Sequence, residues 1–201
     1  MLVISAGSAL DLSWADAHVA AIIDSFYPGA RGGKAVAEAI FGDFSPSGKL
    51  PVTFYQGTEN LPEFTDYDMS DRTYRYTDKN VLYPFGYGLH YGTIRYENAQ
   101  ISCAQCSVRD AVDVSVDVIN ESSYTIHESV QAYIQHEEAD AYEPGYQLKG
   151  IQTVTLQPKE TKRVTISLKA RDFAIITQEG ECVVRPGSYR IAIGGQQPDA
   201  R

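Results

Sequence analysis

Residues 112–118, Val-Asp-Val-Ser-Val-Asp-Val, decide the fold of the second half of the chain. Valine alternates with polar residues, which is the period of a strand that rests one face on a core and turns the other to water. Further strands are predicted over the runs 130–135, 147–156, 163–168 and 188–193. Because turn-forming clusters separate these runs, we expect residues 94–201 to form an antiparallel β-sandwich of immunoglobulin or fibronectin type, with a small β-barrel as the alternative.

The first part of the chain, residues 1–93, has the pattern of an α/β domain. The apolar run 1–4 predicts a buried strand of a parallel sheet. Since a domain seldom begins inside a core strand, we expect the natural protein to extend upstream of Met1. Ser13 and Asp16 then have the spacing of a helix-capping pair. Apolar residues follow at helical spacing, namely Val19, Ile22, Ile23 and Phe26. Together they predict one amphipathic helix over residues 13–26.

A second helix and an edge strand are expected next. Residues 34–41 have a helical pattern, and Gly42 is placed as its C-terminal stop. The alternation over residues 50–54 predicts a strand, which should lie at a sheet edge because Pro51 has no N–H to donate. From residue 56 to 83 the periodicity disappears. A loop of this length is usually functional or packed against another part of the protein.

Residues 83–96, YPFGYGLHYGTIRY, join the two halves and are rich in tyrosine and glycine. Glycine permits sharp backbone changes, and tyrosine buries a flat face while its hydroxyl still forms hydrogen bonds. This combination predicts a seam between the two domains. The alternative is a sugar-binding platform, which would leave the rings exposed. If the seam is correct, most of Tyr83, Phe85, Tyr87 and Tyr91 should be buried.

Composition and charge limit the possible partners. The 201 residues are 43% hydrophobic and 21% charged, as is usual for a globular protein with a core. The net charge of −9 leaves no surplus of Lys and Arg, so nucleic acid is not an expected partner. No apolar run approaches the roughly 18 residues of a membrane helix, and a signal-peptide pattern is lacking. Together with the odd number of cysteines, this favours the cytoplasm.

No metal or cofactor site is predicted. Cys103 and Cys106 have CxxC spacing, but a redox pair should open a helix after a strand, and zinc needs further ligands nearby. We therefore expect structural thiols. The histidines are scattered without ligand spacing at His18, His90, His127 and His136. The glycines before the second helix match neither a nucleotide-binding loop nor a dinucleotide fingerprint.

A series of ordered motifs resembles family 3 glycoside hydrolases. In the first half these motifs are 27–29 (YPG), 32–37 (GGKAVA), 41–54 (FGDFSPSGKLPVTF), 66–69 (DYDM), 72–76 (RTYRY) and 82–89 (LYPFGYGL). In the second half they are 148–150 (LKG), 186–189 (PGSY) and 194–199 (GGQQPD). The resemblance covers essentially the whole chain. It implies that residues 1–93 are the C-terminal part of an α/β sandwich domain and that residues 94–201 are a fibronectin type III-like β-sandwich.

The resemblance also implies a chemistry. Family members are typically β-glucosidases and β-xylosidases that retain the anomeric configuration, which requires two carboxyl groups about 5–5.5 Å apart. In the family the nucleophile is an Asp on an N-terminal barrel, and the acid/base is usually a Glu ahead of the first strand seen here. This chain contains neither segment. We therefore expect no catalytic residue in it, and a carbohydrate partner, a β-glucoside or β-xyloside, in the parent enzyme only.

Four residues of the long loop are candidates for substrate binding in that parent enzyme: Asp66, Asp68, Arg72 and Tyr74. Planar donors and aromatic faces suit hydroxyl-rich rings. The alternative for Arg72, Tyr74 and Tyr76 is packing against the missing barrel, and the two aspartates also suit turn capping or pairing with arginine.

Three functional hypotheses follow. The first is an inactive C-terminal segment of a β-glycosidase. The second is a non-catalytic carbohydrate-binding or scaffold module. The third is a reduced enzyme with a site around Asp66, Asp68 and Arg72. Half of an α/β sandwich should also expose apolar strand edges, which predicts self-association.

Overall fold

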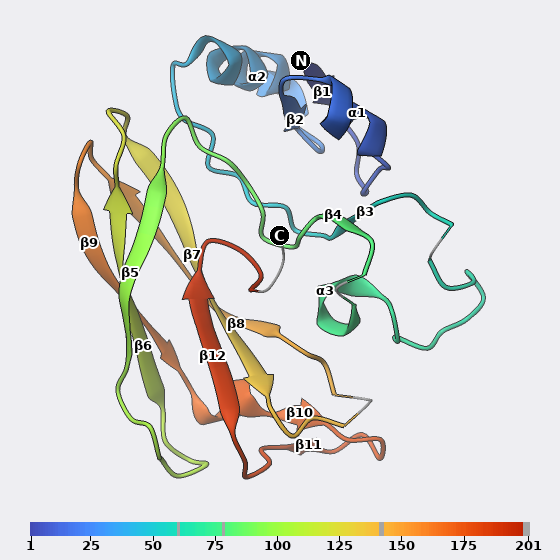
Figure 1. The fold of residues 1–201 in the computed structure, drawn as a ribbon, viewed down its shortest axis with the longest axis vertical. Helices are drawn as coiled ribbons and strands as arrows, with labels where there is room; N and C mark the ends of the chain where they lie inside the picture. Colours follow the sequence, from blue (N-terminus) through green and yellow to red (C-terminus); the bar gives the residue numbers. More distant parts are fainter. Residues whose placement is uncertain (60, 78, 141–142, 199–201) are drawn as a thin grey trace.

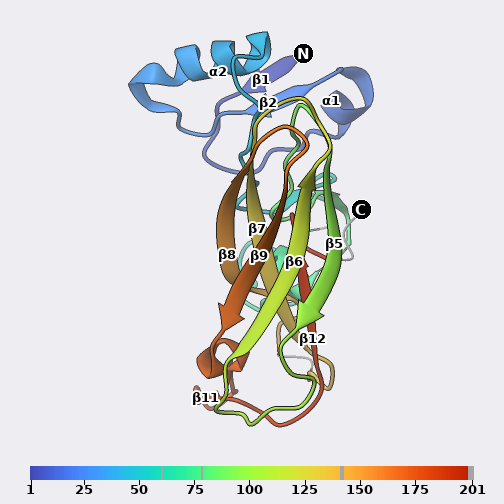
Figure 2. The ribbon, with the colours of Figure 1, turned by 90° about the vertical axis from the view of Figure 1, so that its left-hand side faces the viewer.

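The computed structural model describes residues 1–59, 61–77, 79–140 and 143–198. An elongated β-sandwich forms the larger part, and a small α/β unit covers one end of it (Figures 1 and 2). No helix within the described ranges is long and apolar enough to cross a membrane. The last residue of the predicted 194–199 motif lies outside the described residues.

Two three-stranded antiparallel sheets make up the sandwich. One has the order β5-β6-β9 and the other β12-β7-β8. Their strands are β5 (Ile94–Ile101), β6 (Val112–Asn120), β7 (Ile126–His136), β8 (Gln147–Leu156), β9 (Thr161–Leu168) and β12 (Tyr189–Gly194). A 3-10 turn, η2 (Ala170–Phe173), and a short hairpin of β10 (Ile175–Ile176) and β11 (Cys182–Val183) lie between β9 and β12. The predicted sandwich is confirmed, and β5, β10 and β11 are strands that the sequence pattern did not predict.

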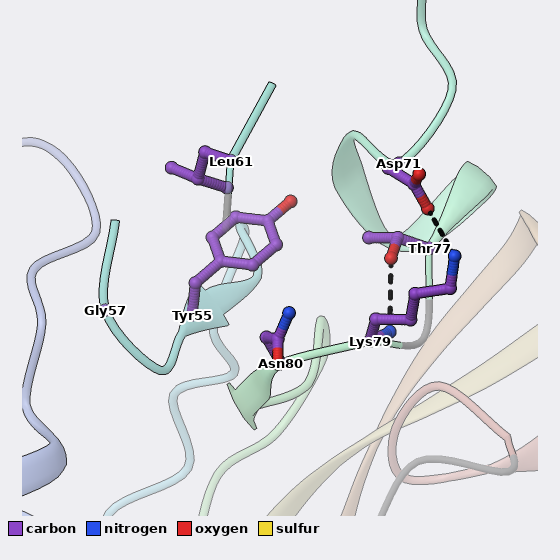
Figure 3. Close-up of a pocket in the computed structure, with 7 residues that line it drawn as sticks. All are labelled: Tyr55, Gly57, Leu61, Asp71, Thr77, Lys79 and Asn80. Atoms are coloured by element: carbon purple, nitrogen blue, oxygen red, sulfur yellow. Dashed lines mark hydrogen bonds and ion pairs between the residues drawn. The ribbon is translucent and has the colours of Figure 1, made fainter. Parts of the chain in front are cut away.

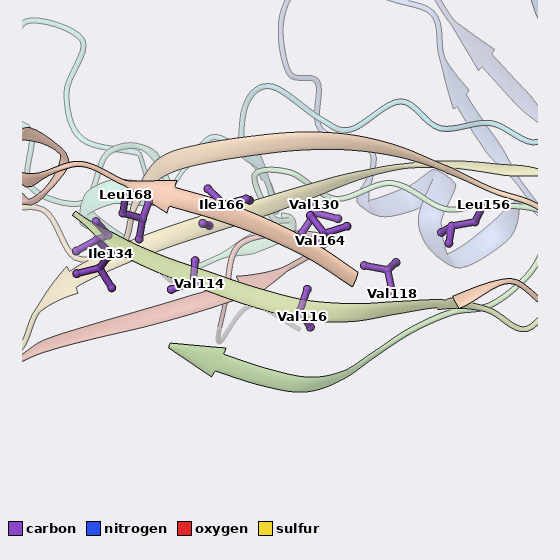
Figure 4. Close-up of a cluster of buried hydrophobic side chains, with 11 residues drawn as sticks. Val114, Val116, Val118, Val130, Ile134, Leu156, Val164, Ile166 and Leu168 are labelled. Carbon is purple, nitrogen blue, oxygen red and sulfur yellow. The ribbon is translucent and has the colours of Figure 1, made fainter. Parts of the chain in front are cut away.

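The core of the sandwich comes from the alternating residues of facing strands. In β6 the valines at 112, 114, 116 and 118 are buried, while the polar residues between them lie at the surface or are half-buried. Figure 4 shows Val114, Val116 and Val118 among side chains of β7, β8 and β9, and Val112 belongs to the same cluster. The period-two pattern therefore predicted both the strand and its buried face correctly.

Strand β7 is unusual because it is buried on both faces at its centre. Residues 130–134 are all buried, although an antiparallel sheet commonly turns one face to water. Val130, Ala132 and Ile134 belong to the core. Gln131 and Tyr133 point to the opposite face, where the Gln131 amide donates to Gly86 O at 3.3 Å and Tyr74 meets the ring of Tyr133 edge-on. The second face is thus covered by the first half of the chain.

The α/β unit begins with two parallel strands, β1 (Leu2–Ile4) and β2 (Ile22–Asp24). Helix α1 (Ser13–His18) lies between them, so the predicted helix over residues 13–26 is wrong beyond residue 18. Ile22 and Ile23 instead pair with β1, and flanking hydrogen bonds such as Leu2 N to Ala21 O at 2.9 Å extend the pairing. Pairing with a distant strand has overridden a local helical period.

The next elements are the turn η1 (Gly29–Arg31) and helix α2 (Gly32–Phe41). The predicted stop is confirmed, because Gly42 has a left-handed φ of 83° and closes the helix. The predicted edge strand over 50–54 is reduced to β3 (Phe54–Tyr55), which pairs antiparallel with β4 (Val81–Tyr83). Upstream of β3, Leu50 exchanges hydrogen bonds with the seam rather than with a strand. Between β3 and β4, the described part of the predicted loop contains the single turn α3 (Thr73–Tyr76).

The tyrosine-rich segment contacts both halves of the molecule. Leu50 N donates to Tyr87 O at 2.8 Å on one side, and Gln197 N donates to Phe85 O at 3.1 Å on the other. A Cβ on Gly88 would lie 2.1 Å from the backbone oxygen of Gly48, so only glycine fits there.

The four aromatic residues of the seam are less buried than predicted, but none of them lies mainly in solvent. Tyr83, Phe85 and Tyr87 are half-buried, and Tyr91 is 37% exposed. Two of the rings keep their hydroxyls at the rim of the contact, where they reach partners: Tyr83 donates to Asp16 Oδ1 and Tyr91 to Ala39 O, both at 2.6 Å. They are not the freely exposed rings that a sugar platform requires.

Candidate functional site

The predicted substrate-binding residues lie in the segment between β3 and β4, and three of them organise one loop. The guanidinium of Arg72 donates to Glu63 O at 2.8 Å, Asp66 O at 2.7 Å and Asp68 O at 3.1 Å. A planar group with several donors can hold three carbonyls at once in this way. Arg72 therefore closes the loop from residue 63 to 72 on itself.

The two aspartates cap turns in the same loop. Asp66 Oδ1 accepts the backbone N–H of Asp68 at 2.9 Å, and Asp68 Oδ1 accepts that of Ser70 at 2.7 Å. Hydrogen bonds from the Ser70 side chain and backbone lower the pKa of Asp68 below its usual value. Both carboxylates are exposed and engaged with backbone N–H groups. The turn-capping alternative describes this geometry.

Two aromatic rings project from this loop into solvent. Phe64 is 92% exposed and Tyr67 is 89% exposed. Both belong to the loop that Arg72 and the two aspartates hold in place. Exposed large apolar residues on an ordered loop are typical of a surface that meets another molecule or domain. Tyr67 lies inside the 66–69 motif, but neither ring was among the predicted site residues, because an isolated aromatic residue in a loop has no periodicity.

Tyr74 is separated from the other three candidates and belongs to the contact between the two halves. Its ring stacks on Phe85 with centroids 4.1 Å apart and an interplanar angle of 13°. Its hydroxyl oxygen accepts the N–H of Leu148 at 3.2 Å. The structure therefore brings Asp66, Asp68 and Arg72 together and places Tyr74 in the seam.

A small pocket lies beside this segment (Figure 3). It has a volume of about 140 Å³ and is lined by Tyr55, Gly57, Leu61, Asp71, Thr77, Lys79 and Asn80. Lys79 crosses it to Asp71 at 3.1 Å, and its backbone N–H donates to Thr77 Oγ1 at 3.1 Å. This volume is below the range of about 300–1,000 Å³ usual for small-molecule sites.

A buried polar cluster that the sequence pattern did not predict joins the two halves. Glu128 on β7 is 1% exposed. Its Oε1 lies 3.1 Å from Lys49 Nζ and accepts a hydrogen bond from the hydroxyl of Tyr96 at 2.7 Å. Its Oε2 lies 2.7 Å from His90 Nε2, at ion-pair distance but without the alignment of a hydrogen bond. We call these four residues the Glu128 cluster.

The electrostatics of the Glu128 cluster favour an ionised carboxylate. Burial raises the pKa of Glu128, but His90, Lys49 and Tyr96 together outweigh burial and hold that pKa below its usual value. Burial and the neighbouring carboxylate raise the pKa of the Tyr96 hydroxyl, so it stays a donor. With one carboxylate and its partners fixed in place, this arrangement joins parts of the chain and does not resemble a pair of catalytic acids.

Comparisons with known proteins agree with the fold. A sequence model of the glycosyl hydrolase family 3 C-terminal domain matches residues 1–91, and a model of the fibronectin type III-like domain matches residues 128–197. The chain is 34% identical to a β-xylosidase of Formosa agariphila over 96% of the chain and 28% of the relative. It is 32% identical to a periplasmic β-glucosidase of Salmonella typhimurium over 96% of the chain and 27% of the relative.

A solved structure is also similar. The structure of a β-glucosidase from Erythrobacter marinus superposes with a TM-score of 0.83 at 35% identity, covering 98% of this chain and 27% of that one. The chain thus spans about a quarter of the length of the relatives it matches.

Proposed function

Because the chain belongs to glycosyl hydrolase family 3, as its C-terminal domain followed by a fibronectin type III-like domain, we propose that it is the non-catalytic segment of a β-glycosidase. In the parent enzyme this glycosidase removes terminal β-linked glucose or xylose with retention of configuration. We place the boundary between the two units at residues 93 and 94, where β5 begins.

One observation carries the proposal. Relatives named β-xylosidase and β-glucosidase match nearly the whole of this chain with only about a quarter of their own length. Retaining hydrolysis needs a nucleophilic carboxylate and a second carboxyl group as acid/base. The loop carboxylates Asp66 and Asp68 are occupied in turn capping, which supports assigning both catalytic groups to polypeptide outside this chain.

The loop from residue 63 to 72 is the part that we assign to the neighbourhood of the sugar in the parent enzyme. Asp66, Asp68 and Arg72 act there as positioning residues, because their polar atoms hold the loop backbone. Phe64 and Tyr67 provide the free surface. Direct contact of Asp66, Asp68, Arg72 or Tyr74 with substrate stays a prediction, and packing of the same loop against the barrel is its alternative.

The test is a pair of activity measurements with nitrophenyl β-glucoside and β-xyloside. The isolated chain, verified intact by mass, should show no turnover above buffer. A chimera should be active when the matching segment of the Salmonella β-glucosidase is replaced by this chain, and that enzyme without the segment should be inactive. Turnover by the isolated chain that disappears in Asp66→Asn or Asp68→Asn would overturn the proposal.

The alternative function is a module that binds carbohydrate without cleaving it. The same fold accommodates this function, and the alternative predicts affinity for oligosaccharides in the absence of turnover. Binding and turnover are separate measurements, so the two functions are distinguishable on the same sample.

A further inference from the structure

A large groove separates α3 and β4 from the outer face of the β12-β7-β8 sheet. Its volume is about 830 Å³, within the range of about 300–1,000 Å³ typical of ligand sites. Figure 1 shows α3 beside this sheet, between β4 and the end of β8. Tyr74, Tyr76 and Asn80 line one wall, and Gln135, Arg190 and Gln197 line the other.

The two walls are fixed to each other before any ligand enters. Gly145 N donates to Arg75 O at 2.7 Å, and the Gln197 amide reaches Tyr74 O at 3.4 Å. Arg75 also contacts Gln147 Oε1 at 3.5 Å. A preformed site avoids the cost of ordering loops on binding.

Charged groups in the groove mostly have partners of opposite charge. Arg190 pairs with Glu137 at 3.0 Å, and Asp71 pairs with Lys79 at 3.1 Å. Glu143 contacts both His136 and Arg185. Arg75 is the exception, because its guanidinium contacts only the neutral Gln147 amide among the described residues. With the other charges paired, the groove suits an uncharged ligand better than a highly charged one.

Neutral polar groups remain available. Gln135, which faces Arg190 across the strand pair, makes no side-chain hydrogen bond within the described residues. Gln197 also lines the groove, but it is only 7% exposed and its Oε1 is itself buried, so Gln135 is the amide that a ligand can reach. The half-buried ring of Tyr76 makes no ring contact or hydrogen bond with the described part of the chain.

From these contacts we propose that the groove binds an uncharged oligosaccharide. Side-chain amides hydrogen-bond to hydroxyl groups, and the flat face of Tyr76 packs on the apolar face of a pyranose ring. The groove borders the loop at residues 63–72 through Ser70 and Asp71, but its binding groups, Gln135 and Tyr76, lie outside that loop, and binding needs no catalytic carboxylate. It goes beyond the proposed hydrolase function, because it binds a chain of sugars whether or not the parent enzyme cleaves it.

Calorimetric titration of the full chain with xylohexaose and cellohexaose tests the site, with hexagalacturonate as a charged comparison. At least one neutral hexamer should bind with a Kd below about 1 mM. Tyr76→Ala should weaken binding at least about tenfold, and Gln135→Ala about fivefold. Tyr76→Phe should retain most of the affinity because the ring remains. Tyr124→Ala, which removes a tyrosine that is exposed outside the groove, should leave the affinity unchanged.

Gln135→Ala keeps the proposal falsifiable if Tyr76→Ala does not fold, because the Gln135 side chain is only half-buried and makes no hydrogen bond within the described residues. The proposal is overturned by absence of binding to both neutral hexamers, by tighter binding of hexagalacturonate, or by affinities that Tyr76→Ala and Gln135→Ala leave unchanged. Hydrolysis plays no part in the measurement, so failure of this site and failure of the proposed function are separate results.

Discussion

Replacing Glu128 by Gln should release the α/β unit from the sandwich. The substitution keeps the size of the side chain and an acceptor for Tyr96, but it removes the negative charge facing Lys49 and His90. Breaking a buried ion pair by changing one partner costs about 3–5 kcal/mol. Lys49 keeps 14% of its side chain exposed, so we expect a value near the lower end, about 3 kcal/mol.

Urea unfolding followed by two probes measures this effect. Trp14 is the only tryptophan and lies on α1, so its fluorescence reports on the α/β unit. Far-ultraviolet circular dichroism reports mainly on the sandwich, whose core excludes Glu128. In the natural chain the two transitions should coincide. In Glu128→Gln the fluorescence midpoint should fall by about 1–2 M urea, ahead of the dichroism.

The matched control is Glu121→Gln, which removes an exposed carboxylate of the sandwich that pairs with Arg95. It should cost at most about 1 kcal/mol. Adding Lys49→Met to Glu128→Gln should recover part of the loss, because the uncompensated charge is then gone. If Glu128→Gln costs no more than Glu121→Gln, or if both probes shift together, the Glu128 cluster does not hold the two units together.

The same cluster predicts a pH dependence. The folded pKa of Glu128 lies below the unfolded value of about 4.5, so the cluster stabilises the protein above that pH. This contribution is lost as the pH falls through the folded pKa. The urea midpoint of the fluorescence transition should therefore fall in the natural chain as the pH drops below about 4.5. In Glu128→Gln this part of the fall should be missing.

Three further predictions concern the α/β unit and the loop. Arg72→Ala should raise the rate of limited proteolysis within residues 63–72 several-fold while changing stability by less than about 1 kcal/mol; an unchanged cleavage pattern would show that Arg72 does not order the loop. Tyr83→Phe removes the hydrogen bond to Asp16 and should cost about 0.5–1.5 kcal/mol in urea unfolding read by fluorescence; no change would mean that the bond is exchanged for water without loss. Phe41 is 84% exposed at the end of α2 and should promote self-association. Phe41→Glu should therefore lower the sedimentation coefficient of concentrated samples toward that of a monomer. A natural chain that is already monomeric at the same concentration would contradict this prediction.

The sequence predicted correctly those elements that are determined by their own residues. The valines of β6 alternate without interruption, and Gly42 supplies the left-handed residue that ends α2. The segment Ile22–Asp24 misled the prediction because its residues also fit a helical period, and only β1 decides in favour of a strand. Strand β5 was missed because its pairing with β6 changes register between Glu97 and Gln100, which breaks the alternation.

The candidate sites were predicted less well than the fold. Motif spacing located Arg72 and its loop, but it did not show that the guanidinium binds carbonyls of its own loop. The Glu128 cluster was not predictable, because Lys49, His90 and Tyr96 are separated from Glu128 by at least 32 positions along the chain. Only the folded arrangement brings those charges together, and no periodicity marks them.

The double burial of β7 has a consequence for how such proteins are assembled. A β-sandwich whose outer sheet faces are polar can be joined to other domains without exposing apolar surface. Here the outer side of the middle strand carries Gln131 and Tyr133 against the seam, so a graft of residues 94–201 alone would leave that stripe bare. The fibronectin-like domain of this chain therefore depends on residues 1–93 to cover part of its surface.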